Sequence, residues 1–146
     1  MDPCARLARR LGYAGLIPFL FLALGRQAFP DIFEENFTIA ALAFYAAIIV
    51  SFMAGLQWAY AIAAPSLGDR ARKGLLIASV VPPVAAWILL GQLGLRNFLL
   101  AAALCLIATA AIDAWLRRQA WFPPWFWRLR VQLTTVAVAC LVIAYF

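Results

Sequence analysis

The sequence contains no histidine, and charged residues make up only 12% of its 146 positions. The missing imidazole argues against bis-histidine haem ligation, most copper and zinc sites, and any serine or cysteine nucleophile that depends on a histidine base. The three cysteines, Cys4, Cys105 and Cys140, show no CxxC spacing, and two of them lie in apolar runs, where a thiol acts as a small hydrophobe. We therefore expect no metal site and no cofactor.

Apolar residues dominate the composition. They make up 67% of the sequence, and the mean hydropathy is +0.93, whereas soluble domains are roughly half apolar and a quarter charged. This balance leaves no room for a separate soluble domain, so we expect residues 1–146 to form one transmembrane domain. The net charge is +6, but the basic residues lie between apolar runs, where they indicate topology and lipid-headgroup contacts rather than a nucleic-acid partner.

Five runs are long enough to cross a bilayer, which takes roughly 20 apolar residues per helix. The first run follows basic residues, as in a signal peptide, but it lacks a small-x-small cleavage site, so we expect it to be retained. The sequence predicts an all-α integral membrane protein, a five-helix bundle with helices at approximately 11–28, 37–64, 74–95, 97–116 and 127–146.

Prolines are expected to disturb this regular pattern. Pro18 predicts a kink in the first helix, and Pro82-Pro83 predict a bend or break near the middle of the third, because each proline removes a backbone donor. Neighbouring helices or a hydroxyl such as that of Ser79 must then satisfy the freed carbonyls. Two more prolines lie in the aromatic stretch WFPPWFW, residues 121–127, which predicts an irregular segment at headgroup level.

The basic residues are distributed unevenly over the predicted connections. Three precede the first helix, three follow the second and four follow the fourth, ten in all, whereas Arg26 and Arg96 are the two on the opposite side. The positive-inside rule then places the N-terminus inside and the C-terminus outside. We expect a multi-pass protein of the bacterial inner (plasma) membrane, with the acidic residues Asp31, Glu34 and Glu35 facing outward.

Small residues recur in the second predicted helix. Lipid offers no hydrophobic drive for helix association, so close packing depends on small side chains that let backbones approach. Such residues follow one another at intervals of four, which predicts a packing face and places this helix at the centre of the bundle. The predicted face comprises Ala43, Ala47, Ser51, Gly55, Ala59 and Ala63.

Polar side chains at membrane depth gather at the inner ends of the predicted helices, while the outer half is almost entirely aliphatic. Because such side chains are costly unless they are paired, an intramembrane ionisable residue is a functional hypothesis by default. The cluster is a candidate ligand or packing site, and no catalytic residue is predicted within it. Its members are Tyr13, Gln57, Trp58, Tyr60, Ser79, Asp113, Arg128, Arg130 and Gln132.

Asp113 is the central member of this cluster. Its expected partner is Arg128 or Arg130, since the end of one helix and the start of the next lie at similar depth. The favoured interpretation is an interfacial salt bridge that pins two helices, and the alternative is a ligand or proton role. Gln57 lies deep enough that its amide needs partners, for which Tyr or Ser side chains of neighbouring helices are candidates.

Several motifs also suggest a family. They are LGYAGLIPF in the first helix, FYAAIIVSFMAGLQW in the second, SVVPPVAAW in the third and DAWLRRQAWFPPWFWRLRVQLTT across the last two. Over nearly its whole length the chain resembles an uncharacterised family, a domain of unknown function, of bacterial and mitochondrial multi-spanning membrane proteins that includes transmembrane protein 69. The resemblance implies a five-helix bundle and no established reaction.

Two functions remain open at this point. The first is a non-enzymatic accessory or assembly subunit of a larger respiratory or photosynthetic membrane complex, which small size and a small-residue face favour. The second is a carrier or a lipid- or quinone-binding protein with an inner-leaflet polar cleft, which the polar cluster favours. An enzyme ranks third, because the sequence offers no paired carboxylates and no nucleophile–base pair.

Overall fold

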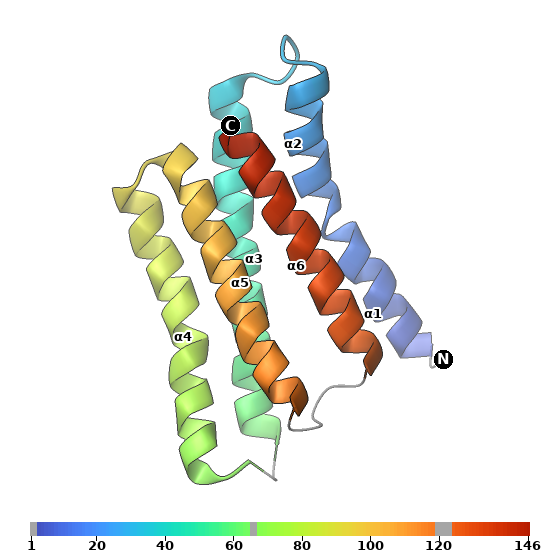
Figure 1. The fold of residues 1–146 in the computed structure, drawn as a ribbon, viewed down its shortest axis with the longest axis vertical. Coiled ribbons are helices and arrows are strands. Elements are labelled where there is room, and N and C mark those ends of the chain that lie inside the picture. Colours follow the sequence, from blue (N-terminus) through green and yellow to red (C-terminus); the bar gives the residue numbers. More distant parts are fainter. Residues whose placement is uncertain (1–2, 65–66, 119–123) are drawn as a thin grey trace.

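The computed structural model describes residues 3–64, 67–118 and 124–146. Helices make up almost all of this part of the chain, and five spans, the first made of α1 and α2 together, are long and apolar enough to cross a membrane. This confirms the predicted all-α membrane fold. The helices run alternately up and down, so that the C-terminus lies at the opposite end of the bundle from the N-terminus (Figure 1). They are α1 (Pro3–Ala14), α2 (Ile17–Ala28), α3 (Glu35–Ala63), α4 (Asp69–Gln92), α5 (Leu95–Arg118) and α6 (Pro124–Tyr145).

The first span begins earlier than predicted and is divided into α1 and α2. The division lies at Gly15 and Leu16, one turn before Pro18, because a proline has no N–H and its ring clashes with the carbonyl four residues earlier. The Tyr45 hydroxyl of α3 donates a hydrogen bond of 2.8 Å to the Gly15 carbonyl. Pro18 is predicted to kink this span; the structure shows a full break there, and a hydrogen bond from a neighbouring helix contacts it.

The third span, α4, departs from the prediction in two ways. It begins at Asp69 rather than Gly74, and it stays helical through Pro82 and Pro83, so the expected break is absent. Transmembrane helices tolerate proline where neighbouring helices pack against them, and α4 packs against both α3 and α5. The Ser79 hydroxyl donates to Leu76 O at 2.8 Å, so it does not bind the carbonyls that the two prolines leave free.

The last span begins at Pro124, three residues before the predicted start. Proline is favoured at the first position of a helix, where its missing N–H has no helical partner to lose. The irregular segment predicted over residues 121–127 is therefore wrong for Pro124 to Trp127, which are helical. Residues 121–123 lie outside the described part of the chain.

The core is built around α3, as predicted. This helix packs against α2, α4 and α5, while α6 packs against α5, α2 and α1. Large buried side chains such as Phe19, Leu42, Phe98 and Leu141 fill the space between α2, α3, α5 and α6. A smaller apolar cluster lies at the end of the bundle where α3 meets α4 and α5 meets α6.

The predicted small-residue face of α3 is wrong as a face of the core. Ala43 is buried, but Ser51, Gly55, Ala59 and Ala63 are exposed, and a Cβ added at Gly55 would meet nothing within 4 Å. Each step of four residues advances an α-helix by about 40° beyond a full turn, so a strict four-residue series winds around the helix. The buried face instead combines steps of three and four, as at Ala46, Val50, Ala54, Gln57 and Ala61.

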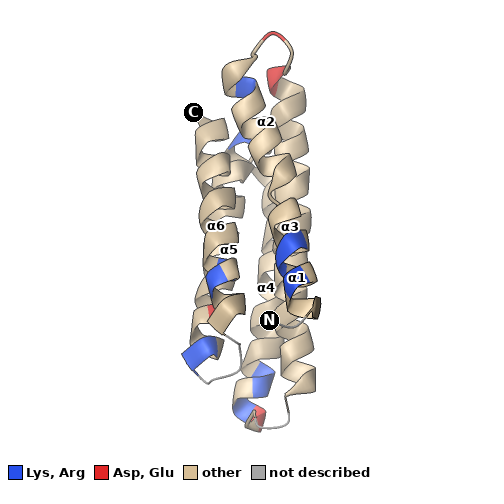
Figure 2. Cartoon of the chain, turned by 90° about the vertical axis from the view of Figure 1, so that its right-hand side faces the viewer, with Lys and Arg blue, Asp and Glu red and all other residues tan. Residues whose placement is uncertain are grey.

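Charged residues gather toward the two ends of the bundle, with an uncharged band between them (Figure 2). At the end that holds the C-terminus, Arg26 of α2 and Arg96 of α5 both pair with Glu35 of α3. The same arginines donate to the last carbonyls of α6, Arg26 to Ala144 O at 2.9 Å and Arg96 to Tyr145 O at 2.7 Å. We call these three charged residues the C-terminal clamp, and their contacts were not predicted from the sequence.

Candidate functional site

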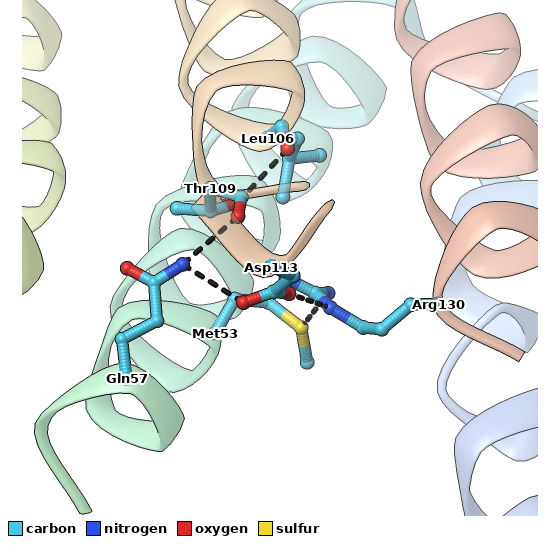
Figure 3. A network of polar contacts seen from close by, with 6 residues as sticks. All are labelled: Met53, Gln57, Leu106, Thr109, Asp113 and Arg130. Atoms are coloured by element: carbon cyan, nitrogen blue, oxygen red, sulfur yellow. Dashed lines mark hydrogen bonds and ion pairs between the residues drawn. The ribbon is translucent and has the colours of Figure 1, made fainter. Parts of the chain in front are cut away.

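Three members of the predicted polar cluster meet inside the bundle. Gln57 lies on α3, Asp113 on α5 and Arg130 on α6, and the side chains point toward one another (Figure 3). Arg130 lies about 9 Å along α6 from its first residue by helical rise. The helices therefore bring one acidic, one basic and one amide side chain together below the surface.

An ion pair forms the centre of this network. Arg130 Nε donates to Asp113 Oδ2 at 2.5 Å, and each of the two side chains is only 4% exposed. Of the two predicted partners of Asp113, Arg130 is correct. The expectation of an interfacial bridge is wrong in one respect: both charges are removed from solvent, so their mutual pairing matters far more than at a surface.

Gln57 extends the network toward α5. Its Nε2 donates to Thr109 O at 2.8 Å and to Asp113 Oδ1 at 3.0 Å, so both carboxylate oxygens of Asp113 accept a hydrogen bond. The predicted Tyr or Ser partners of this amide are replaced by a backbone carbonyl and a carboxylate. The Thr109 hydroxyl itself donates to Leu106 O at 2.9 Å.

Part of the Arg130 guanidinium is poorly satisfied. Its Nη1 contacts the Met53 sulfur, and a thioether is a weak acceptor. Its Nη2 is buried and has no hydrogen-bond partner among the described residues, and the same is true of Thr134 Oγ1, one turn further along α6. Two polar atoms of α6, one turn apart, thus have no partner among the residues that the structure describes.

A cavity of about 100 Å³ lies beside these two residues. Its wall comes from the α1–α2 break at Gly15, from Phe52 and Met53 of α3, and from Arg130 and Thr134 of α6. Most of the remaining wall is apolar. The exposed Phe52 side chain, together with Leu11 of α1, lies where the cavity meets the lipid-facing surface. The cavity thus combines a hydrophobic wall with two unpaired polar groups.

Other predicted members of the cluster lie elsewhere. Tyr13 donates to Gln132 Oε1 at 2.6 Å, and this pair borders a second, polar cleft with Arg128 and Arg9 at the basic end of α1 and α6. Ser79 is buried in α4. Of the remaining two, Trp58 is 45% exposed, and Tyr60 packs against the smaller apolar cluster.

Sequence reasoning missed Met53, Thr109 and Thr134. A signal for them was available, because each precedes or follows a predicted member by four residues: Met53 and Gln57, Thr109 and Asp113, Arg130 and Thr134. Residues at this spacing share a helix face. Polar side chains and methionine at this spacing on α3, α5 and α6 therefore indicate that one network connects these three helices at a single depth.

The arrangement favours binding over catalysis. An arginine guanidinium stays protonated in proteins and so supplies donors and charge, not proton transfer. Within residues 3–64, 67–118 and 124–146, no three His, Cys, Asp or Glu side chains approach closely enough to hold a metal ion. The site thus offers an apolar cavity bordered by two residues, each of which has a buried donor without a partner among the described residues.

Comparison with known proteins gives two similarities. The model of a family described as "Protein of unknown function (DUF3429)" matches residues 4–146. Transmembrane protein 69 of Xenopus tropicalis is 36% identical over 135 residues, which cover 90% of this chain and 51% of the Xenopus protein. The chain thus spans about half the length of this curated relative. No solved structure matches the chain significantly.

Proposed function

This chain belongs to DUF3429, a family of proteins of unknown function, and from that premise we propose that it binds a lipophilic ligand within the membrane. The observation that carries the proposal is the cavity beside Arg130 and Thr134. Both residues border it, and each has a buried polar atom for which the described part of the chain provides no partner. The function is one of binding, without catalysis.

Unpaired donors supply the physical reason. Leaving a buried donor unsatisfied costs about 1–3 kcal/mol, and more for a charged group, so a guanidinium nitrogen in this position favours an acceptor. A ligand oxygen in the cavity would accept from Arg130 Nη2 and Thr134 Oγ1 together, because the two residues are one turn apart on α6. The apolar wall would hold the rest of the head group.

The size of the cavity limits what it holds. An apolar cavity of about 150 Å³ accepts a benzene ring, so a cavity of about 100 Å³ takes a smaller group, such as a carbonyl and the atoms next to it, while the rest of the ligand extends out of the cavity. A longer tail must leave past Leu11 and Phe52, which are exposed on the surface that faces lipid. A quinone or a membrane lipid meets both conditions.

A second candidate function is that of an accessory or assembly subunit of a larger membrane complex. The specific observation in its favour is the exposed position of Ser51, Gly55, Ala59 and Ala63 on α3. Small residues on a lipid-facing surface would let a partner helix approach closely. The two candidates differ in what should remain bound after gentle extraction.

Native mass spectrometry of the protein extracted from its own membrane tests both. We expect a lipophilic molecule to be retained in stoichiometric amount, and Thr134→Val to reduce its retention by about 3- to 10-fold, since one hydrogen bond contributes about 0.5–1.5 kcal/mol. Thr135→Val is the matched control, because Thr135 is exposed and does not border this cavity. Equal retention by both variants contradicts the binding function, and a stoichiometric set of larger subunits supports the second candidate.

We also propose that the N-terminus lies inside and the C-terminus outside a bacterial inner membrane. The start of α1, the start of α4 and the end of α5 lie at the same end of the bundle. Basic residues lie near each of these helix ends, namely Arg6, Arg9, Arg10, Arg70 and Arg117. The positive-inside rule places that end in the cytoplasm. A membrane-impermeant maleimide should therefore label Phe146→Cys in intact cells but label the exposed Cys4 only after permeabilisation. Cys4→Ser gives the background, and the reverse pattern of labelling rejects this orientation.

A further inference from the structure

We infer that the cavity beside Arg130 selects a ligand with a neutral carbonyl group over a ligand with an anionic head group. This inference rests on the proposed binding function and specifies its ligand class. It follows from the ion pair that Arg130, the cationic side chain among the described residues of the cavity wall, already makes with Asp113.

The charge of Arg130 is neutralised before any ligand arrives. Arg130 is the charged residue that borders the cavity, and its Nε is held by Asp113 Oδ2 at 2.5 Å. Both side chains are almost fully buried, so the pair brings no net charge to the cavity. A carboxylate or phosphate at Nη2 would place a second negative charge next to that of Asp113, and like charges at low dielectric repel strongly.

The hydrogen-bonding capacity left over suits a carbonyl oxygen. Arg130 Nη2 and Thr134 Oγ1 lack partners in the described chain, and a carbonyl oxygen has two lone pairs that accept from two donors. A carbonyl gains these bonds without adding charge. The remaining guanidinium nitrogen, Nη1, is not available to a ligand, because it contacts the Met53 sulfur.

Two sources of such a carbonyl fit a cavity of about 100 Å³. One is the ring of a quinone, and the other is the ester group of a glycerolipid. Both carry the same neutral acceptor on a hydrophobic body, and both leave a tail that can pass between Leu11 and Phe52 into lipid. The chemistry they share is what the Arg130–Asp113 pair recognises.

The test compares ligands that differ in charge. Purified protein in nanodiscs of ether-linked neutral lipid, which has no ester carbonyl, is titrated at pH 9 with decylbenzoquinone, with methyl dodecanoate and with dodecanoate, the last two being a neutral ester and a carboxylate with the same acyl chain. We expect at least one neutral ligand to bind about tenfold or more tightly than dodecanoate. Quinone binding without ester binding identifies the first source, and the opposite result identifies the second.

Asp113→Asn provides a second, independent measurement. It keeps the shape of the side chain but removes the negative charge, so the Arg130 charge becomes available to an anion. Affinity for dodecanoate should rise about tenfold relative to that for methyl dodecanoate. Gln132→Leu is the control, because Gln132 contacts Tyr13 at the second cleft and should leave the ratio unchanged.

The outcomes separate the two proposals. If dodecanoate binds wild-type protein as tightly as the neutral ligands do, the selectivity inference is overturned and the binding function stands. If none of the three ligands binds, the proposed function fails together with the inference. The wild-type comparison needs no variant, so poor folding of Asp113→Asn does not remove the test.

Discussion

Replacing Arg130 by methionine is expected to lower the free energy of unfolding by about 3–5 kcal/mol, which is the usual effect of removing one partner of a buried ion pair. The loss arises because Asp113, only 4% exposed, is left in a buried site without its cationic partner. A Met side chain has a similar length, so lost volume contributes little. The measurement is the unfolding transition in mixed micelles with an increasing fraction of SDS.

Two further variants show whether the pairing is responsible. Arg128→Met is the matched control, because Arg128 is exposed two residues earlier on α6, and it should change stability by less than about 0.5 kcal/mol. Combining Arg130→Met with Asp113→Leu should recover most of the lost stability, since a buried pair replaced by apolar residues of similar volume is often neutral. If Arg130→Met alone were as stable as wild-type protein, the Arg130 and Asp113 charges would not both be buried.

Adjacent substitutions on α3 are expected to have opposite effects. Ala54→Leu places a large side chain where the alanine is 0% exposed, and overpacking a helix interface costs about 1–3 kcal/mol, occasionally more. Gly55→Leu fills open space, since an added Cβ meets nothing within 4 Å. It should be neutral or stabilise α3 by up to about 1 kcal/mol, because leucine is the better helix former.

The same SDS titration compares these two variants. They share a helix, a depth and the introduced side chain, so the difference reports the orientation of α3 alone. A larger destabilisation by Gly55→Leu than by Ala54→Leu would reverse the assignment of the buried face. It would also support the accessory-subunit function if the effect appeared only in protein still bound to partners.

Much of this architecture is visible in the sequence, because lipid imposes a simple length rule. Uncharged runs of sufficient length predict the five spans, and Pro18 predicts a kink in the first of them. That Asp113 pairs with Arg128 or Arg130 also follows from their position at the junction of two spans, although the sequence does not choose between the two arginines. In each case a local property of the chain determines the result, so no knowledge of neighbouring helices is needed.

Rotation and helix boundaries are harder to predict. The series from Ala43 to Ala63 is predicted to form one face from its four-residue spacing. Each step of four residues turns the helix by about 40° more than a full turn, so the second half of the series lies on the surface. The start of α4 at Asp69 is missed because charged residues can extend a helix beyond the hydrocarbon region. The cavity depends on where α1 lies relative to α3 and α6, which is a tertiary property that no single segment encodes.

The C-terminal clamp sets the order in which one end of the bundle closes during biosynthesis. A chain made from its N-terminus delivers Arg26, Glu35 and Arg96 before the last turn of α6, whose carbonyls at Ala144 and Tyr145 those arginines bind. Before that turn inserts, the two guanidiniums can pair with Glu35 and with water, but their bonds to α6 are not yet made. Insertion of α6 is therefore the step that closes this end of the bundle.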